Sequence, residues 1–486
     1  MVSDLEWAIK QVQSRRQEKY VLYRNYYEGE HRLAFASEKF RNTFGTLFKE
    51  FAENVCAPVV DSLSDRLVIT GFKTNQAETV AEEIPSVLDS ATKTTKVTVR
   101  DETADEALEI WRYNRMDLQS NEIHTESLKE GDAYAIVWPN EEGRAEVFPN
   151  YAANCAVEYD PQTRKKVLRG AKVWWDWIEG RWYVTLYFPD RLEKYRQRST
   201  SQTLAEKSNG FILYEEIPNP YGEVPLFHFP NKRIAACGVS ELQNVIPLQD
   251  GLNKAVMDMM IAMEFASFKQ RYVIGLEVEV DETTGEPTDP TYRNYGADRM
   301  MAIPDPDAKV GQFDATDLGQ FLRVQEKFWA SAARVSGTPL HYFFITQGDF
   351  PSGEAMKSAE ARFVKKIKDR QIAFGNVWEN VVKFALKIEG KEVPDDLQVE
   401  ALWLDAAPKS EAELADTAVK KKAVGVSRSQ LLKEMGYDDE TVYRMLEETD
   451  AHNAAQAAAK QRADEEATNP NGQPKPTESG TKGVPK

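Results

Sequence analysis

Long apolar runs, paired cysteines and clustered histidines are all missing from this sequence of 486 residues. No window approaches the ~20 consecutive apolar residues of a membrane-spanning helix, and the N-terminus lacks the basic and apolar regions of a secretory signal. The three cysteines, Cys56, Cys155 and Cys237, are far apart and odd in number. We therefore expect reduced thiols in a protein made in a cytoplasm, with no disulfide framework, no metal site and no membrane contact.

Motifs of common enzyme classes are absent as well. The sequence contains no GxxxxGK[ST] phosphate loop, no GxSxG nucleophile turn, and no HExxH or CxxC metal motif. Carboxylates are abundant, but no two of them form a recognisable catalytic pair. We expect neither catalytic residues nor a cofactor.

Positive charge is scarce for a protein that would grip nucleic acid. The chain has 61 Lys and Arg against 78 Asp and Glu, a net charge of −17. Binding to the phosphate backbone over a broad surface normally needs a basic protein. An acidic chain can still surround DNA without adhering to it, since salt screens repulsion beyond ~10 Å.

The sequence does contain enough apolar material for a sizeable core, at 42% of its residues. Helical spacing predicts helices between Leu5 and Tyr27 and from Phe48 to Arg66. Strand-like runs occupy 133–138, 172–178 and 181–188. A two-residue loop ending in Gly180 predicts a hairpin between the last two runs, so we expect an α+β fold.

Four tryptophans gather around that predicted hairpin: Trp174, Trp175, Trp177 and Trp182. Such a cluster is compatible with a platform for carbohydrate or nucleic-acid bases. We favour the simpler interpretation, in which the aromatic face of a sheet packs against helices.

Three long helices are predicted in the second half of the chain, at about 240–268, 317–335 and 354–388, each with one apolar stripe at three- and four-residue steps. Ser240 and Gln243 match a capping box. The third helix is about 50 Å long, and only Arg370 interrupts its stripe. Its first half is basic, which indicates either a solvated face or partners for acidic groups elsewhere.

The segments between these helices differ in character. Residues 270–316 open with a strand at 271–280, continue as an acidic loop, and indicate a small β-containing module at the tip of a two-helix stalk. Glycines and prolines at both ends of 338–353 forbid one continuous helix there.

Beyond residue 390 the sequence predicts short helices at 411–423, 428–435 and 440–448, and a disordered tail from 451. Residues 427–442 resemble a helix-turn-helix. Their turn and second helix are acidic, which argues against a recognition helix facing phosphates. Two helices packed around a glycine turn are the better interpretation.

Four short stretches in this order resemble portal proteins of long-tailed double-stranded-DNA bacteriophages, and most closely those of phages that infect actinobacteria. They are Tyr26–Gly29, Glu50–Asp61 with Gly71-Phe72, Gly238–Lys254, and Pro351–Lys357. Each stretch alone is weak, but their order over some 400 residues is much more specific.

The resemblance implies the portal fold with these segments: an α/β wing (1–238), stem helix 1 (239–269), a clip (270–316), stem helix 2 (317–337), a tunnel loop (338–353), the long helix behind it (354–390), a helical crown (391–450) and a disordered tail (451–486). Family members assemble as closed rings of twelve subunits at one capsid vertex. The resemblance therefore implies a virion protein that forms the channel for DNA packaging and ejection. Its implied partners are terminase and then the head–tail adaptor at the clip, and scaffold and major capsid protein at the wing.

On this resemblance, candidate functional residues fall into three groups. Candidates for the DNA channel on the stem are Arg323, Lys327 and Arg334, although inter-subunit salt bridges stay open as an alternative role for them. Candidates on the tunnel loop are His341, Tyr342, Thr346 and Gln347, while Phe343, Phe344 and Ile345 are as well suited to anchor the loop. Candidates for partner binding on the clip are Glu277, Glu279, Asp281, Glu282 and Glu286.

Two other functions stay open from the sequence. One is a DNA-binding or DNA-processing protein with a C-terminal helix-turn-helix. The other is a head-assembly protein that forms no channel.

Overall fold

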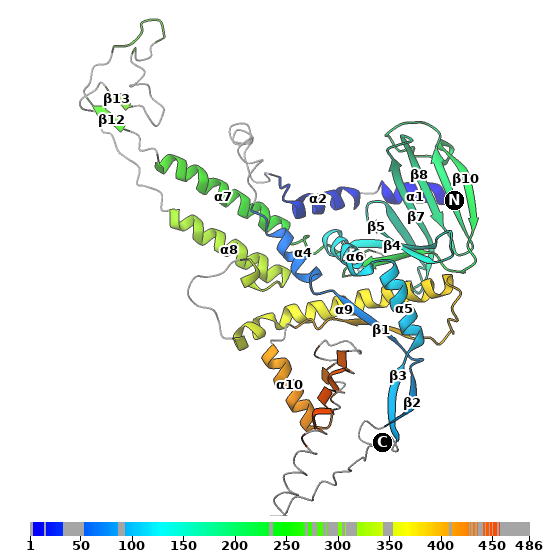
Figure 1. Cartoon of the computed structure of the whole chain (residues 1–486). Coiled ribbons are helices and arrows are strands. Elements are labelled where there is room, and N and C mark those ends of the chain that lie inside the picture. The colour runs from blue at the N-terminus through cyan, green and yellow to red at the C-terminus, as the bar shows by residue number, and fades with distance from the viewer. Residues whose placement is uncertain are drawn as a thin grey trace, which may run out of the picture. The chain divides into compact units, whose positions relative to one another are not determined.

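A computed structural model describes residues 3–13, 16–32, 53–85, 93–232, 237–267, 271–274, 279–284, 288, 300–303, 307, 318–343, 353–407, 411–426 and parts of 428–456. The chain divides into two compact units (Figure 1). The first comprises residues 1–76 and 101–406, and the second comprises 77–100 and 407–486.

A five-stranded antiparallel sheet forms one part of the first unit, in the order β10-β9-β8-β7-β6. Its strands are β6 (Cys155–Tyr159), β7 (Val167–Asp176), β8 (Arg181–Tyr187), β9 (Arg191–Gln197) and β10 (Phe211–Pro218). Helix α1 (Asp4–Val12) buries Leu5, Ala8 and Ile9 against β7 and β8. The predicted β7–β8 hairpin is confirmed, with Asp176 opposite Arg181.

The tryptophan cluster of this hairpin is only partly packed. Trp175 makes edge contacts with both Trp177 and Trp182, but Trp177 is 82% exposed. The expectation that the aromatic face packs wholly against helices is therefore wrong for Trp177. Trp177 lies in the loop between β7 and β8, outside the part of the sheet that α1 covers.

A second, three-stranded sheet has the order β11-β4-β5. Its strands are β4 (Asp132–Pro139), β5 (Ala145–Tyr151) and β11 (Leu226–Pro230), and it packs against α6 (Met116–Glu130) and α9 (Gly353–Ile388). Six consecutive residues of β4 are buried, as expected of a strand covered on both faces. This sheet and the helices around it carry the main hydrophobic core.

Helix α9 confirms the predicted long helix to within one residue. Its 36 residues correspond to about 54 Å. Phe363, Ile367, Phe374 and Trp378 are completely buried, which explains how so long a helix is stabilised along its length. At the centre of this core, His124 of α6 accepts a hydrogen bond from Trp378 Nε1 at 2.8 Å and stacks on Phe374.

The remaining elements of the first unit are α2 (Arg16–Glu28), α4 (Cys56–Ser64), α5 (Glu102–Tyr113), β1 (Ile69–Thr74) and β14 (Val399–Trp403). Strand β14 pairs antiparallel with β1, although some 330 residues separate them in sequence. The first unit therefore extends to residue 406, beyond the predicted start of the crown segment at 391.

Helices α7 (Ile246–Ser267) and α8 (Leu318–Ser336) lie side by side, with the short parallel pair of β12 (Arg271–Ile274) and β13 (Met300–Ile303) beyond them (Figure 1). A Cβ on Gly251 would lie 2.6 Å from the Phe328 ring, so the two helices approach too closely for a larger residue there. The predicted helix at 317–335 is confirmed by α8.

The predicted start of α7 near Ser240 is wrong. Residues 241–245 form turns and the helix begins at Ile246. Ser240 does not cap it, because its hydroxyl donates to the Lys129 carbonyl and accepts from Leu242 N at 3.0 Å. Pro247 lies in the first turn, where a missing N–H costs nothing.

The second unit contains the antiparallel pair β2 (Glu78–Pro85) and β3 (Lys93–Arg100), which was not predicted from the sequence. It also contains α10 (Glu411–Ala423), whose bounds match the predicted helix. The predicted helices at 428–435 and 440–448 lie only partly within the described residues. The disordered tail predicted from 451 is wrong at its start, because residues 451–453 and 456 are helical, and residues 457–486 lie outside the described part of the chain.

None of the three cysteines forms a disulfide, and Cys56 and Cys155 are buried. Among the residues described, no helix is long and apolar enough to cross a membrane. The same residues hold no group of three His, Cys, Asp or Glu side chains arranged to bind a metal ion.

Candidate functional site

The connection between α8 and α9 is anchored where it leaves α8. Gly337 ends the helix with φ +76°, a left-handed conformation that other residues adopt at a cost. Two cations of α9 then bind the last carbonyls of α8. Lys366 Nζ donates to the Ser336 carbonyl at 2.8 Å and Arg362 Nη1 to the Arg334 carbonyl at 3.3 Å. These bonds satisfy carbonyls that the helix itself leaves unpaired.

Two of the four predicted loop residues can be placed, and both contact the protein body. The Tyr342 hydroxyl accepts a hydrogen bond from Arg66 and donates to Glu360 Oε1 at 3.4 Å. His341 Nε2 lies 3.2 Å from the same carboxylate oxygen. Burial raises the pKa of Tyr342, and Phe343 packs on the main core. Thr346 and Gln347, with Phe344 and Ile345, lie outside the described residues.

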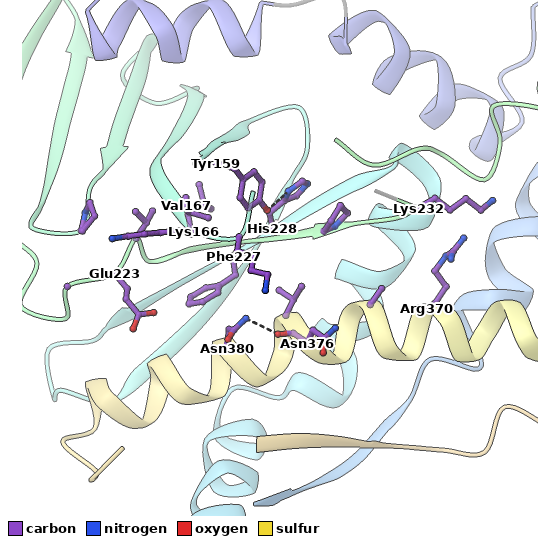
Figure 2. A pocket seen from close by; sticks show the side chains of 18 residues that line it. Tyr159, Lys166, Val167, Glu223, Phe227, His228, Lys232, Arg370, Asn376 and Asn380 are labelled. Carbon is purple, nitrogen blue, oxygen red and sulfur yellow. Dashed lines mark hydrogen bonds between the residues drawn. The ribbon is translucent and has the colours of Figure 1, made fainter. Parts of the chain in front are cut away.

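A cleft of about 830 Å³ opens between α9 and strands β6, β7 and β11 (Figure 2). Phe227 of β11 points toward Asn376 and Asn380 of α9, and the buried His228 hydrogen-bonds with Tyr159 at 3.0 Å behind it. Cations line much of the cleft: Lys165, Lys166, Lys232 and Arg370.

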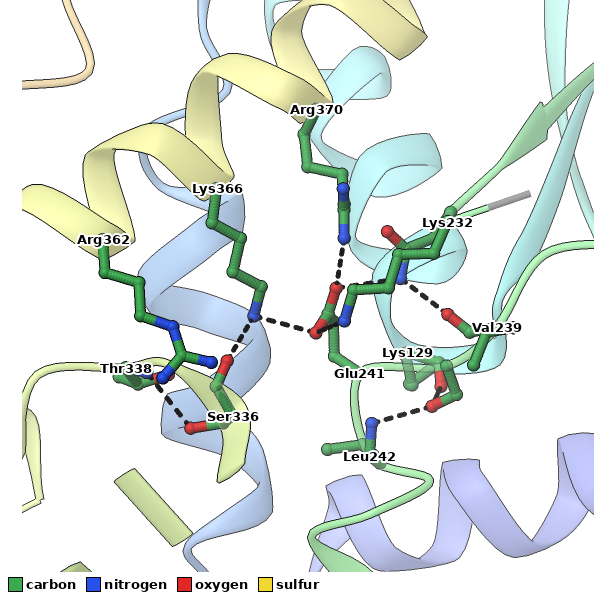
Figure 3. A network of polar contacts seen from close by, with 12 residues as sticks. Lys129, Lys232, Val239, Glu241, Leu242, Ser336, Thr338, Arg362, Lys366 and Arg370 are labelled. Atoms are coloured by element: carbon green, nitrogen blue, oxygen red, sulfur yellow. Dashed lines mark hydrogen bonds and ion pairs between the residues drawn. The ribbon is translucent and has the colours of Figure 1, made fainter. Parts of the chain in front are cut away.

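Beside the cleft, a buried carboxylate collects three of the chain's cations (Figure 3). Glu241, whose side chain is 1% exposed, lies in the turn that precedes α7. Its Oε2 is 2.8 Å from Lys366 Nζ and 2.7 Å from Lys232 Nζ, and its Oε1 is 2.9 Å from Arg370 Nη2. We call these four residues the Glu241 hub.

The three cations of the hub keep the buried Glu241 carboxylate ionised. Burial alone would raise the pKa of Glu241, but Lys366, Lys232 and Arg370 outweigh burial and lower it to about 2. The carboxylate is therefore ionised at any physiological pH. Burial lowers the pKa of Lys366 to about 8 despite the attraction of Glu241. Removing Glu241 from this buried cluster would leave the charges of the cations without a partner, so the ion pairs fix the positions of the segments that carry them.

The hub joins three segments that are distant in sequence. Lys232 and Glu241 flank the turn leading into α7, Lys366 and Arg370 belong to α9, and Lys366 also binds the end of α8. The turn before α7 and the end of α8 are thus tied to the same stretch of α9. Sequence reasoning missed Glu241, but the signal was present: Arg370 interrupts an apolar stripe and so demands a buried partner.

The predicted cationic residues of α8 lie on a different surface. Arg323, Lys327 and Arg334 are all exposed. The opposite side of the helix packs inward, where Trp329 Nε1 donates to Glu53 Oε1 at 2.6 Å. The structure therefore brings these three residues together on one accessible helix, apart from the hub.

The predicted acidic loop is described only in part. Glu279, Asp281 and Glu282 are exposed. Asp281 Oδ1 accepts from Thr283 N at 2.7 Å, and these backbone hydrogen bonds lower the pKa of Asp281. Glu277 and Glu286 lie outside the described residues.

Comparison with known proteins agrees with the resemblance carried by the four sequence stretches. The family described as "Phage portal protein, SPP1 Gp6-like" matches residues 8–457. The portal proteins of Mycobacterium phages D29 and L5 are each 25% identical to this chain over 401 residues, which cover 78% of this chain and 74% of theirs. Since the match spans nearly all of the chain, including α7, α8, α9 and the hub between them, this protein belongs to the SPP1 Gp6-like family of phage portal proteins.

Proposed function

We propose that this chain is the subunit of a twelve-membered ring at one capsid vertex, and that the ring is the channel through which double-stranded DNA is packaged and later ejected. The family match over residues 8–457 carries the proposal, because it covers the whole arrangement and not a single module. In this role the protein is a structural conduit. Motion and ATP hydrolysis are supplied by the terminase.

The α8–α9 connection has a direct part in this function. The hub and the Arg66–Tyr342–Glu360 contacts hold its α8 end to the protein body. In this proposal, Thr346 and Gln347 of the tunnel loop keep the DNA-contacting role that the resemblance implies. His341 and Tyr342 serve mainly as its anchor, since their polar atoms already face Glu360.

DNA passes through an acidic ring without being held. A net charge of −17 per chain opposes broad phosphate binding. Arg323, Lys327 and Arg334 are exposed, and ring symmetry multiplies each into a circle of cations. Such circles supply weak and transient phosphate contacts, which suits a channel in which DNA must slide.

The exposed carboxylates of Glu279, Asp281 and Glu282 suit basic patches on partners. In the proposed function, this clip docks the terminase during packaging and the head–tail adaptor afterwards. Scaffold and major capsid protein contact the wing, and the assembled ring resides in the virion after synthesis in the host cytoplasm.

Particle mass and negative-stain imaging of the purified protein test the proposal. We expect rings near a dozen subunits with an axial hole. A stable monomer or dimer contradicts the ring, and a particle without a hole favours a head-assembly protein that forms no channel. Metal-dependent cleavage of DNA by the pure protein would favour a DNA-processing role.

A further inference from the structure

Two large apolar side chains project into solvent at the connection of the β7–β8 hairpin. Trp177 is 82% exposed and its neighbour Ile178 is 97% exposed. Isolated apolar residues on a surface are ordinary. Adjacent Trp and Ile side chains at a single tip are unusual, since an exposed Trp is the kind of residue that anchors protein interfaces.

The tip is held in a fixed conformation. Asp176 Oδ1 accepts hydrogen bonds from Ile178 N at 2.7 Å and Glu179 N at 3.0 Å, and Gly180 N donates to the Asp176 carbonyl at 2.9 Å. A turn closed by three hydrogen bonds loses little conformational freedom when a partner binds it. The turn that carries Trp177 and Ile178 therefore has its conformation before a partner binds.

Negative charge frames the tip. Asp176 and Glu179 stand on either side of Trp177 and Ile178, and the Glu179 side chain is exposed. Glu179 accepts a hydrogen bond from the Tyr183 hydroxyl. A partner surface for this tip must therefore be apolar in the middle and basic around it.

The cleft beside α9 has this composition. Val167, Phe227 and Val377 give it an apolar lining, with Asn376 and Asn380 along the α9 side (Figure 2). Lys165 and Lys166, just before β7, are exposed and line the cleft. The one carboxylate in the lining, Glu223, is ion-paired with Lys387.

The tip cannot enter the cleft of its own chain. Val167, which lines the cleft, is the first residue of β7, and Asp176, which begins the tip, is the last. Ten residues of strand in a five-stranded sheet span about 30 Å. The two complementary surfaces therefore sit at opposite ends of one rigid strand, so that only a second copy can join them.

We propose that the β7–β8 tip of one subunit docks into the α9 cleft of the next subunit. Trp177 and Ile178 then cover the apolar lining, and Asp176 and Glu179 face Lys165 and Lys166. Such a contact joins two different surfaces, and repeated head to tail it closes a ring. The inference rests on the proposed ring, and it names the surfaces that join its subunits.

Disulfide trapping tests this contact directly. In a Cys237→Ser background, Ile178→Cys is combined with Asn376→Cys, which lies in the cleft lining, and each single variant serves as a control. In assembled rings under mild oxidation, only the double variant should form a ladder of covalently linked subunits on a non-reducing gel. Rings of normal mass without a ladder overturn the inference and leave the portal function standing. Failure of the unmodified protein to form rings overturns both.

Charge exchange supplies a second test that needs no cross-link. The pair Lys165→Glu and Lys166→Glu should lower the fraction of protein in rings about tenfold at fixed concentration, and adding Glu179→Lys should recover most of it. Trp177→Ala should have a comparable effect, whereas Leu118→Ala, at a residue 76% exposed on α6, should have none. Ring formation unchanged in Trp177→Ala and in the charge-reversed pair contradicts the contact. Binding of scaffold or capsid protein lost in Trp177→Ala while rings persist also contradicts it, because the tip would then serve that partner.

Discussion

Neighbouring helices of this protein use their basic residues in opposite ways. On α9, Lys366 and Arg370 are turned inward, where the buried Glu241 compensates them at 2.8 and 2.9 Å. On α8, Lys327 and Arg334 remain exposed to solvent. The residue types are the same, and the difference lies in whether a buried carboxylate is within reach.

That difference separates cations that stabilise the fold from cations that remain available to a partner. Buried, paired cations fix the geometry of the α8–α9 connection, because any movement exposes an uncompensated charge in a region of low dielectric. Exposed cations contribute little to stability and stay available to a partner. Changes at the hub should therefore affect folding, and changes on α8 should affect DNA passage.

The largest effect is expected from Glu241→Gln. This substitution keeps the shape of the side chain but leaves Lys366 and Arg370 buried without a counter-charge, which should lower the free energy of unfolding by ~3–5 kcal/mol. Urea unfolding at pH 7 measures the change. Glu282→Gln is the matched control at an exposed position of the acidic loop and should change stability by less than ~0.5 kcal/mol. Equal changes in the free energy of unfolding for the two substitutions would contradict a special stabilising role of the buried Glu241.

Acid should remove the stabilising contribution of Glu241 by protonating its carboxylate. Because the pKa of Glu241 in the folded protein is about 2, below its ordinary value of 4.5, its stabilising contribution is complete above pH 4.5 and is lost as the pH falls toward 2. The stability difference between the unmodified protein and Glu241→Gln should shrink by ~3 kcal/mol over that window. Urea unfolding at a series of pH values measures it.

Other titrating groups cancel in that difference. Burial lowers the pKa of His124 to about 3, so the native state loses stability as the pH falls from 6.5 toward 3 in both proteins alike. A stability difference that does not vary between pH 5 and pH 2 would show that the three cations do not hold Glu241 ionised.

Single helices and hairpins could be predicted because each depends on residues that are close together in the sequence. The α9 stripe and the β7–β8 hairpin follow from the spacing of apolar residues and a short glycine turn. The β1–β14 pair and the Glu241 hub join segments separated by more than a hundred residues, so no spacing rule predicts them. The predicted start of α7 at Ser240 was wrong for the same reason, since the Ser240 hydroxyl hydrogen-bonds to the carbonyl of Lys129, which is distant in sequence.

Tyr342→Phe should have a smaller effect than the hub changes. The substitution removes the hydroxyl that bridges Arg66 and Glu360 but keeps the ring against Phe363. Arg66 and Glu360 retain their own ion pair at 3.5 Å, so the loss should be ~1 kcal/mol. Thermal unfolding measures it. A DNA-packaging defect at unchanged stability would instead indicate that this hydroxyl acts on DNA.

The smallest effect on stability is expected on α8. Arg323, Lys327 and Arg334 are exposed, so replacing Lys327 and Arg334 together with Ala should change the free energy of unfolding by less than ~0.5 kcal/mol. Ring formation should also persist, since these residues take no part in the hub. DNA packaging in assembled particles should nevertheless fall, because the channel loses two circles of phosphate contacts. Glu326→Ala, an exposed substitution of opposite charge on the same helix, is the control. Normal packaging by the double variant would contradict a DNA-facing role and favour salt bridges between subunits, whereas rings weakened by it would place these cations at an interface.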